Sequence, residues 1–155
     1  VIQGRVDVGV AYVALDKALA GGVIVTLNCP LNEHTHHLID ATSIAKMKPG
    51  AMLVNTGRGA LIDTAAALDA LKSEHIGSLA LDVYEEEGDL FFEDRSDEIL
   101  DDDNFARLLT YPNVLITAHQ AFLTHEALAA IAQTTLANVT SVLAGEPCPN
   151  TVTAS

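Results

Sequence analysis

The sequence is poor in residue types that mark several classes of protein. Its 155 residues include no Trp and only two cysteines, Cys29 and Cys148, which form no CxxC pair. Two distant cysteines give no disulfide framework, so we expect free thiols in a reducing compartment. No apolar run reaches the length that spans a bilayer, and the first residues show no charged-then-apolar leader. We therefore expect a cytoplasmic protein with no membrane partner.

Positive charge is equally scarce. Lys and Arg together number 8 against 21 Asp and Glu, which gives a formal net charge of −13. A surface of this sign repels phosphate backbones and anionic lipids, so we expect no nucleic-acid partner. Hydrophobic residues make up 49% of the chain, and aromatic residues make up 5%. A chain of this length and composition suits one domain that buries roughly two thirds of its unfolded surface.

Apolar segments of strand length alternate with segments of helical periodicity. The segment 23–28 is β-branched and apolar, which is typical of a strand buried in a parallel sheet. The alternation predicts an α/β fold with a parallel, doubly wound sheet and flanking helices. Strands are expected at 23–28, 51–55, 78–83 and 114–117, and helices at 15–19, from the cap Asp40 through 45–47, and at 64–72, 105–109 and 126–143.

A glycine-rich turn follows the second of these strands. Gly57 and Gly59 flank Arg58, and Asp63 then opens the next helix. The carboxyl edge of an open α/β sheet is where such folds bind ligands. A guanidinium at that edge suits bidentate capture of a carboxylate. Spacing alone leaves the alternative that Arg58 pairs with one of the chain's own acidic residues.

Two later strand ends carry groups that complement this arginine. Asp82 ends one strand and is followed by three glutamates up to Glu87, and His119 follows another strand. Histidine exchanges protons near neutral pH, so it can serve a carbonyl or hydroxyl oxygen. A neighbouring carboxylate orients the imidazole and favours its protonated form. The equally weighted alternative is that His119 caps a strand and Glu87 belongs to a solvated acidic run.

Other motifs are weaker. His34, His36 and His37 invite a metal site, but no Cys or acid stands at ligand spacing, so we expect a solvated loop and no metal. The glycines around Arg58 do not continue as GxGxxG. The acidic run 101–103 lacks the ordered pattern of a calcium loop.

Five blocks of sequence stand in a fixed order. They are Asn-Cys-Pro-Leu at 28–31, Thr-His-His-Leu-Ile at 35–39, Val-Asn-Thr-Gly-Arg-Gly at 54–59, Ala-Leu-Asp-Val-Tyr-Glu at 80–85 and Pro-Asn-Val-Leu-Ile-Thr-Ala-His-Gln-Ala at 112–121. In this order, over about residues 9–147, the chain resembles the NAD-dependent D-2-hydroxyacid dehydrogenases. Its long acidic connection, 85–103, is similar to that of the D-lactate dehydrogenase branch of the family.

The resemblance implies a role for each of the polar strand-end residues. Arg58 would bind the substrate carboxylate, His119 would be the acid/base, and Glu87 would be its carboxylate partner. The implied cofactor is NAD, the implied substrate is a small 2-oxo or 2-hydroxy acid such as pyruvate or D-lactate, and the complete enzyme is expected to be a homo-oligomer. The positions implied to line the cofactor are Cys29, Pro30, Thr35, Thr56, Gly57, Arg58 and Asp82.

The chain also departs from the family pattern. The family's GxGxxG turn precedes every block found here, and Ala118 replaces a more usual Gly or Pro. We therefore expect an incomplete Rossmann-like domain over residues 1–123, followed by a helix and tail, 124–155, that return toward a missing catalytic domain. Two alternatives remain at this point: a dehydrogenase for another D-2-hydroxy acid, and a non-catalytic acidic interaction domain.

Overall fold

A computed structural model describes residues 11–90 and 102–152 of the chain. The chain forms two compact units, Val1–His119 and Gln120–Ser155. The acidic connection predicted over 85–103 lies largely outside the described residues. The two units are described below one after the other.

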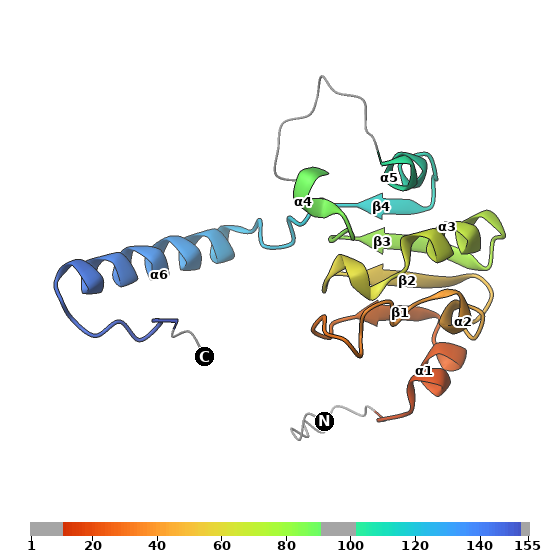
Figure 1. Cartoon of the computed structure of the whole chain (residues 1–155), viewed down its shortest axis with the longest axis horizontal. Helices are drawn as coiled ribbons and strands as arrows, with labels where there is room; N and C mark the ends of the chain where they lie inside the picture. The colour runs from red at the N-terminus through yellow and green to blue at the C-terminus, as the bar shows by residue number, and fades with distance from the viewer. Residues whose placement is uncertain (1–10, 91–101, 153–155) are drawn as a thin grey trace. The chain divides into compact units, whose positions relative to one another are not determined.

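The first unit is built on a four-stranded parallel sheet with the strand order β1-β2-β3-β4. The four arrows of Figure 1 lie side by side and point the same way, so all four carboxyl ends meet at one edge. The predicted Rossmann-like parallel sheet with flanking helices is confirmed. The strands are β1 (Ile24–Leu27), β2 (Ala51–Asn55), β3 (Ile76–Leu81) and β4 (Val114–Ile116).

Short helices precede β1 and connect the strands that follow. Three of them begin at an aspartate whose carboxylate accepts the backbone N–H three residues later, from Ser43, Ala66 and Phe105 respectively. Such caps satisfy donors that the first helical turn leaves without partners. The elements are α1 (Leu15–Gly21), α2 (Ala41–Ile44), the 3-10 helix η1 (Gly59–Leu61), α3 (Thr64–Lys72), α4 (Glu87–Leu90) and α5 (Asp103–Leu108).

The core lies between one face of the sheet and these helices. Leu53 and Leu79 of the sheet are buried together with Leu68 of α3 and Leu108 of α5. Because successive strand residues point to opposite faces, Met52, beside Leu53, lies on the other face. That face is open among the described residues: Ile24, Met52 and Leu115 are 62%, 38% and 61% exposed.

The prediction that segment 23–28 is a buried strand is wrong. Of the four residues of β1, only Leu27 is buried. Within the described part of the chain β1 pairs with β2 alone, so it is an edge strand with one uncovered face. Its β-branched residues fix it as a strand, whereas burial depends on what covers it.

The second unit contains one long helix, α6 (His125–Leu143). Thr124 caps it by accepting the N–H of Ala127, and the chain leaves it through Gly145, whose φ of 70° suits glycine. No residue of α6 is buried, although much of the helix is apolar. Among the described residues, no helix is both long and apolar enough to cross a membrane.

Candidate functional site

A buried asparagine shapes the turn that carries Arg58. Asn55 ends β2 and is fully buried. Its side-chain amide donates to the carbonyl of Arg58 at 2.8 Å, and its side-chain oxygen accepts the N–H of Gly57 at 3.0 Å. These two bonds close the turn around the arginine. This role of Asn55 was not predicted, although a polar residue at the end of an apolar strand, just before a glycine turn, was a usable signal.

Gly59 allows the turn after β2 to lie against the segment after β3. A Cβ atom at this position would lie 2.0 Å from the carbonyl carbon of Tyr84 and 2.4 Å from the nitrogen of Glu85. Both atoms belong to the backbone, which moves less readily than a side-chain end. The glycine is therefore required for the close contact between the Arg58 turn and the segment that leads to Glu87.

The structure brings Glu87 and His119 together. The Nδ1 atom of His119 lies 2.9 Å from Oε1 of Glu87, and Oε2 of Glu87 accepts the backbone N–H of Tyr84 at 3.0 Å. The backbone N–H of His119 donates to the carbonyl of Asp82. The two side chains are 34% and 19% exposed, so the pair is held by the fold but remains accessible.

His119 sits on an unusual stretch of backbone. Ala118 and His119 both have left-handed φ values, 54° and 55°. Residues with a Cβ atom adopt this region at a cost of roughly 1–3 kcal/mol each, and such conformations concentrate at functional sites. Glycine would adopt the positive φ at position 118 without this cost.

Two residues predicted to line the cofactor have clear structural contacts. Asp82 is buried, and its Oδ1 accepts the hydroxyl of Thr117 at 2.5 Å, which joins the ends of β3 and β4. The hydroxyl of Thr35 donates to the carbonyl of Pro30 at 2.7 Å and accepts the N–H of Asn32 at 2.9 Å. Thr35 thus closes the loop after β1. Their predicted contacts with a cofactor stay predictions.

An open hollow of about 590 Å³ lies at the carboxyl ends of β1 and β2. This volume falls within the range of small-molecule sites, roughly 300–1,000 Å³. A Cβ on Gly57 would lie 3.1 Å from Cδ1 of Leu61 and 3.3 Å from the carbonyl oxygen of Leu27, so the chain packs closely against this glycine. The lining of the hollow consists of five predicted cofactor positions, Cys29, Pro30, Thr56, Gly57 and Arg58, together with Asn28 and Leu31, which were not predicted.

This hollow fits one end of the dinucleotide that the resemblance implies. It offers a thiol, a hydroxyl, an amide and a guanidinium beside apolar surface, which suits a flat ring with polar substituents. Arg58 borders it, and its Nη1 donates to the carbonyl of Gly57 at 2.7 Å. That Arg58 shares a single cleft with Glu87 and His119 stays a prediction.

Comparison with known proteins agrees with this geometry. The family model for the NAD binding domain of D-isomer specific 2-hydroxyacid dehydrogenases matches residues 3–121. The chain is 52% identical to a 2-hydroxyacid dehydrogenase homolog of Haemophilus influenzae and 51% identical to a D-lactate dehydrogenase of Escherichia coli, over 94% and 93% of its length. It spans 44% of the length of each of these curated relatives.

Solved structures agree with the fold. The structure that identified the pyruvate reductase of Chlamydomonas reinhardtii superposes with a TM-score of 0.85 at 50% identity, over 92% of this chain and 44% of that one. A Salmonella D-lactate dehydrogenase superposes with a TM-score of 0.82 at 50% identity, over 95% of this chain and 45% of that one. The chain therefore belongs to the D-isomer specific 2-hydroxyacid dehydrogenases, and residues 3–121 form part of their NAD binding domain.

Proposed function

We propose that this chain is the portion of an NAD-dependent D-lactate dehydrogenase that carries the catalytic side chains and one side of the cofactor site. The observation that carries the proposal is the 2.9 Å contact between His119 and Glu87 at the carboxyl edge of the sheet. The names of the Escherichia coli and Chlamydomonas relatives favour D-lactate and pyruvate as the substrate pair. When bound, NADH supplies the hydride that reduces the carbonyl carbon of pyruvate.

The side chains of this segment divide the remaining work. Arg58 holds the substrate carboxylate with its planar fork. Glu87 accepts from Nδ1 of His119 and thereby fixes the ring, so proton transfer to the substrate oxygen falls to Nε2. Pyruvate, NADH and this proton give D-lactate and NAD⁺, and in the reverse direction His119 takes the proton back.

The cofactor positions belong to the same proposal. Cys29, Pro30, Thr56, Gly57 and Arg58 line the hollow and would contact the nicotinamide side of NAD. We extend the assignment to Thr35 and Asp82. We also propose that residues 1–123 are the NAD-binding part of this chain, and that residues 124–155 return toward the remainder of a complete enzyme.

The setting of the complete enzyme is proposed from its chemistry. Both cysteines are free, and free thiols together with an NADH-dependent reaction suit the reducing cytoplasm. We expect the complete enzyme to be a homo-oligomer. Sedimentation of the complete protein and fractionation of the source cells would test these two points, and a monomer or an exported protein would contradict them.

A chimera tests the catalytic role of His119. These 155 residues would replace the matching portion of the Escherichia coli D-lactate dehydrogenase, and pyruvate-dependent NADH oxidation would be measured. We expect His119→Ala to lower kcat by about a hundredfold to ten-thousandfold, the usual contribution of a general acid or base, while NADH still binds. His125→Ala, a change at the exposed start of α6, is the matched control. Turnover of the His119 variant within about twofold of the parent would exclude the assignment.

Two further variants separate binding from proton transfer in the same chimera. Arg58→Lys should mainly raise KM for pyruvate, because a point charge cannot reproduce the bidentate fork. Arg107→Lys, at an exposed position of α5, is the matched control and should not raise KM. Glu87→Gln should lower kcat. Glu86→Gln, a change at the exposed neighbouring position, is its control and should leave kcat unchanged.

A panel of 2-oxo acids tests the alternative substrate assignment. A higher kcat/KM for a bulkier acid than for pyruvate would make this a dehydrogenase for another D-2-hydroxy acid.

A further inference from the structure

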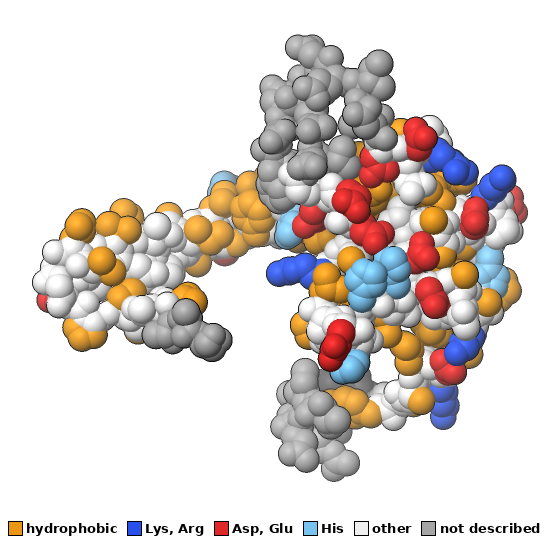
Figure 2. Space-filling view, viewed as in Figure 1, with side chains coloured by type: hydrophobic (Ala, Val, Ile, Leu, Met, Phe, Trp, Pro, Cys, Tyr) orange, Lys and Arg blue, Asp and Glu red, His pale blue; other side chains and the backbone are white. Residues whose placement is uncertain are grey.

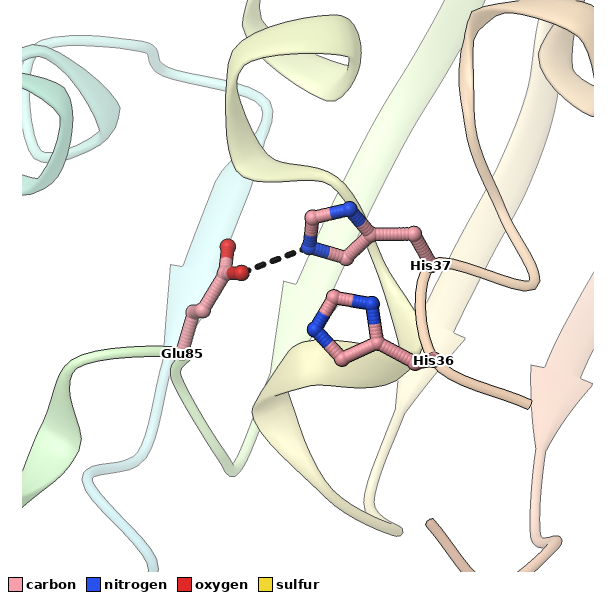
Figure 3. Close-up of side chains that lie close together, drawn as sticks. All are labelled: His36, His37 and Glu85. Atoms are coloured by element: carbon pink, nitrogen blue, oxygen red, sulfur yellow. Dashed lines mark hydrogen bonds and ion pairs between the residues drawn. The ribbon is translucent and has the colours of Figure 1, made fainter. Parts of the chain in front are cut away.

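A second cluster with histidines contains none of the residues assigned above. His36 and His37 stand in the loop after β1, and Glu85 stands in the segment after β3. Figure 3 shows the two rings and the carboxylate directed toward a common space. Nε2 of His37 lies 2.6 Å from Oε1 of Glu85, the ring centroids of the histidines are 4.0 Å apart, and one ligand atom from each residue lies within 4.8 Å of the others.

The backbone and a hydroxyl hold this arrangement in place. The N–H of His37 donates to the carbonyl of Ala60 at 2.8 Å, and His37 has a left-handed φ of 49°. The second oxygen of Glu85 accepts the hydroxyl of Thr64 at 3.2 Å. The two ligands with the least exposure are thus fixed by contacts with η1 and α3, so little ordering is left for an ion to impose.

The donor set determines which ion fits. Two imidazole nitrogens and one carboxylate oxygen are ligands typical of Zn²⁺, whereas Mg²⁺ and Ca²⁺ prefer oxygen alone. Two atoms bound to one Zn²⁺ at about 2.0–2.2 Å lie within roughly 4.4 Å of each other. The ligand atoms lie within 4.8 Å of one another here, so binding would require His36, which is exposed, to move closer. The ion would replace the proton between His37 and Glu85.

The surroundings favour a cation. His37 and Glu85 are 33% and 23% exposed and His36 is exposed, which leaves an entry path and room for a water ligand. On the face shown in Figure 2, His side chains lie among several Asp and Glu side chains. The net charge of −13 attracts divalent cations to the protein as a whole.

We propose that His36, His37 and Glu85 form a binding site for a divalent transition metal, Zn²⁺ in particular. From the sequence we expected no metal here, because no acid stood at ligand spacing. In the structure Glu85, 48 positions later in the chain, contacts His37. The ion would join the loop after β1 to the segment that leads to Glu87. This site is independent of the proposed dehydrogenase activity.

Metal titration of the 155-residue chain tests the site. After removal of metal with a chelator, Zn²⁺ binding would be measured by calorimetry and by competition with a coloured chelator. We expect one equivalent to bind, and His36→Ala, His37→Ala and Glu85→Gln each to weaken binding by more than about tenfold, since changes even outside the ligand set cost ten- to a hundredfold. His34→Ala, in the same loop with a side chain 85% exposed, is the matched control and should bind as the parent does.

Thermal unfolding gives a second readout. Zn²⁺ should raise the Tm of the parent and of His34→Ala, because a ligand that binds the native state stabilises it, and should not raise the Tm of Glu85→Gln. Glutamine keeps an acceptor for Thr64, and His36→Ala alters an exposed side chain, so these two variants test binding without disturbing the core. Absence of one-equivalent binding, equal binding by all variants, or equal binding of Mg²⁺ would each overturn the proposal.

Discussion

The residues that we propose to carry chemistry depend on neighbours that have no proposed chemical role. Arg58 is presented by the side chain of Asn55, which bonds to both sides of the turn. Gly59 lets that turn lie against the backbone of Tyr84. His119 is directed toward Glu87 by a left-handed backbone that begins at Ala118. Each of these supporting residues therefore offers a test of the site that leaves the reactive groups in place.

Gly59→Ala should destabilise the chain. The added Cβ would overlap backbone atoms of Tyr84 and Glu85, and overpacking of this kind costs roughly 1–3 kcal/mol. Urea unfolding would measure the loss. Gly21→Ala is the matched control, because nothing lies within 4 Å of its Cβ position in α1. Equal stability of the two variants would show that the close contact at Gly59 is not required.

At the scale of elements, the helices of the first unit are short and rely on their caps. The carboxylate of Asp102 accepts the N–H of Phe105 at the start of α5 and also the hydroxyl of Tyr84 at 2.5 Å. Burial, and then the hydrogen bond to Asp102, raise the pKa of the Tyr84 hydroxyl, so it stays a donor. One aspartate thus ties α5 to the segment after β3.

The cap of α2 gives a prediction about pH. The backbone N–H of Ser43 lowers the pKa of Asp40 below its ordinary value of 3.8, against a smaller opposing effect of desolvation. A lowered folded-state pKa stabilises the protein above the ordinary value, and this stabilisation disappears as the pH falls through the folded-state pKa. Asp40→Asn should therefore lower the Tm at pH 7 and lower it less near pH 3. A Tm difference that does not change with pH would contradict this account.

Helix α6 presents apolar side chains to solvent within its own unit. Leu136, Val139 and Leu143 are 68%, 50% and 83% exposed, and Leu128 and Ile131 are 43% and 51% exposed. Exposed apolar patches of this kind promote association. We expect Leu136→Glu to reduce self-association of the chain in sedimentation velocity. Gln133→Glu adds the same charge to the same helix without removing a leucine, so an equal effect of both changes would assign the result to charge alone.

At the scale of the whole molecule, the 155 residues alone should not reduce pyruvate. Positioning of reactants can supply roughly 7–11 kcal/mol of a barrier, and the sequence contains no GxGxxG turn to hold the pyrophosphate. The open face of the sheet, with Ile24 and Leu115 exposed, adds a second surface for association. We expect no NADH oxidation, weak NAD binding in calorimetry, and self-association. Saturable pyruvate reduction by the purified chain would contradict this prediction.

The sequence by itself determined the fold class and the order of the strand ends. Helical periodicity predicted α3 at 64–72, the bounds that the structure has, and placed the start of α6 within one residue. Local pattern carries this information because periodicity and caps act over a few residues. Since parallel strands end at one edge, the positions after β3 and β4 predicted that one of three glutamates could lie near His119. The family resemblance selected Glu87 among them, and its contact with His119 at 2.9 Å agrees.

Tertiary structure decided what covers each element and which distant residues meet. The sequence pattern of β1 predicts a buried strand, but three of its four residues are not buried. Their exposure depends on which elements pack against β1, and the local sequence pattern does not specify those elements. The need for glycine at position 59 arises from backbone that follows a different strand. Glu85 joins His37 for the same reason. Contacts between residues far apart in the chain are set by how the strands pair, and spacing along the sequence carries no measure of that distance.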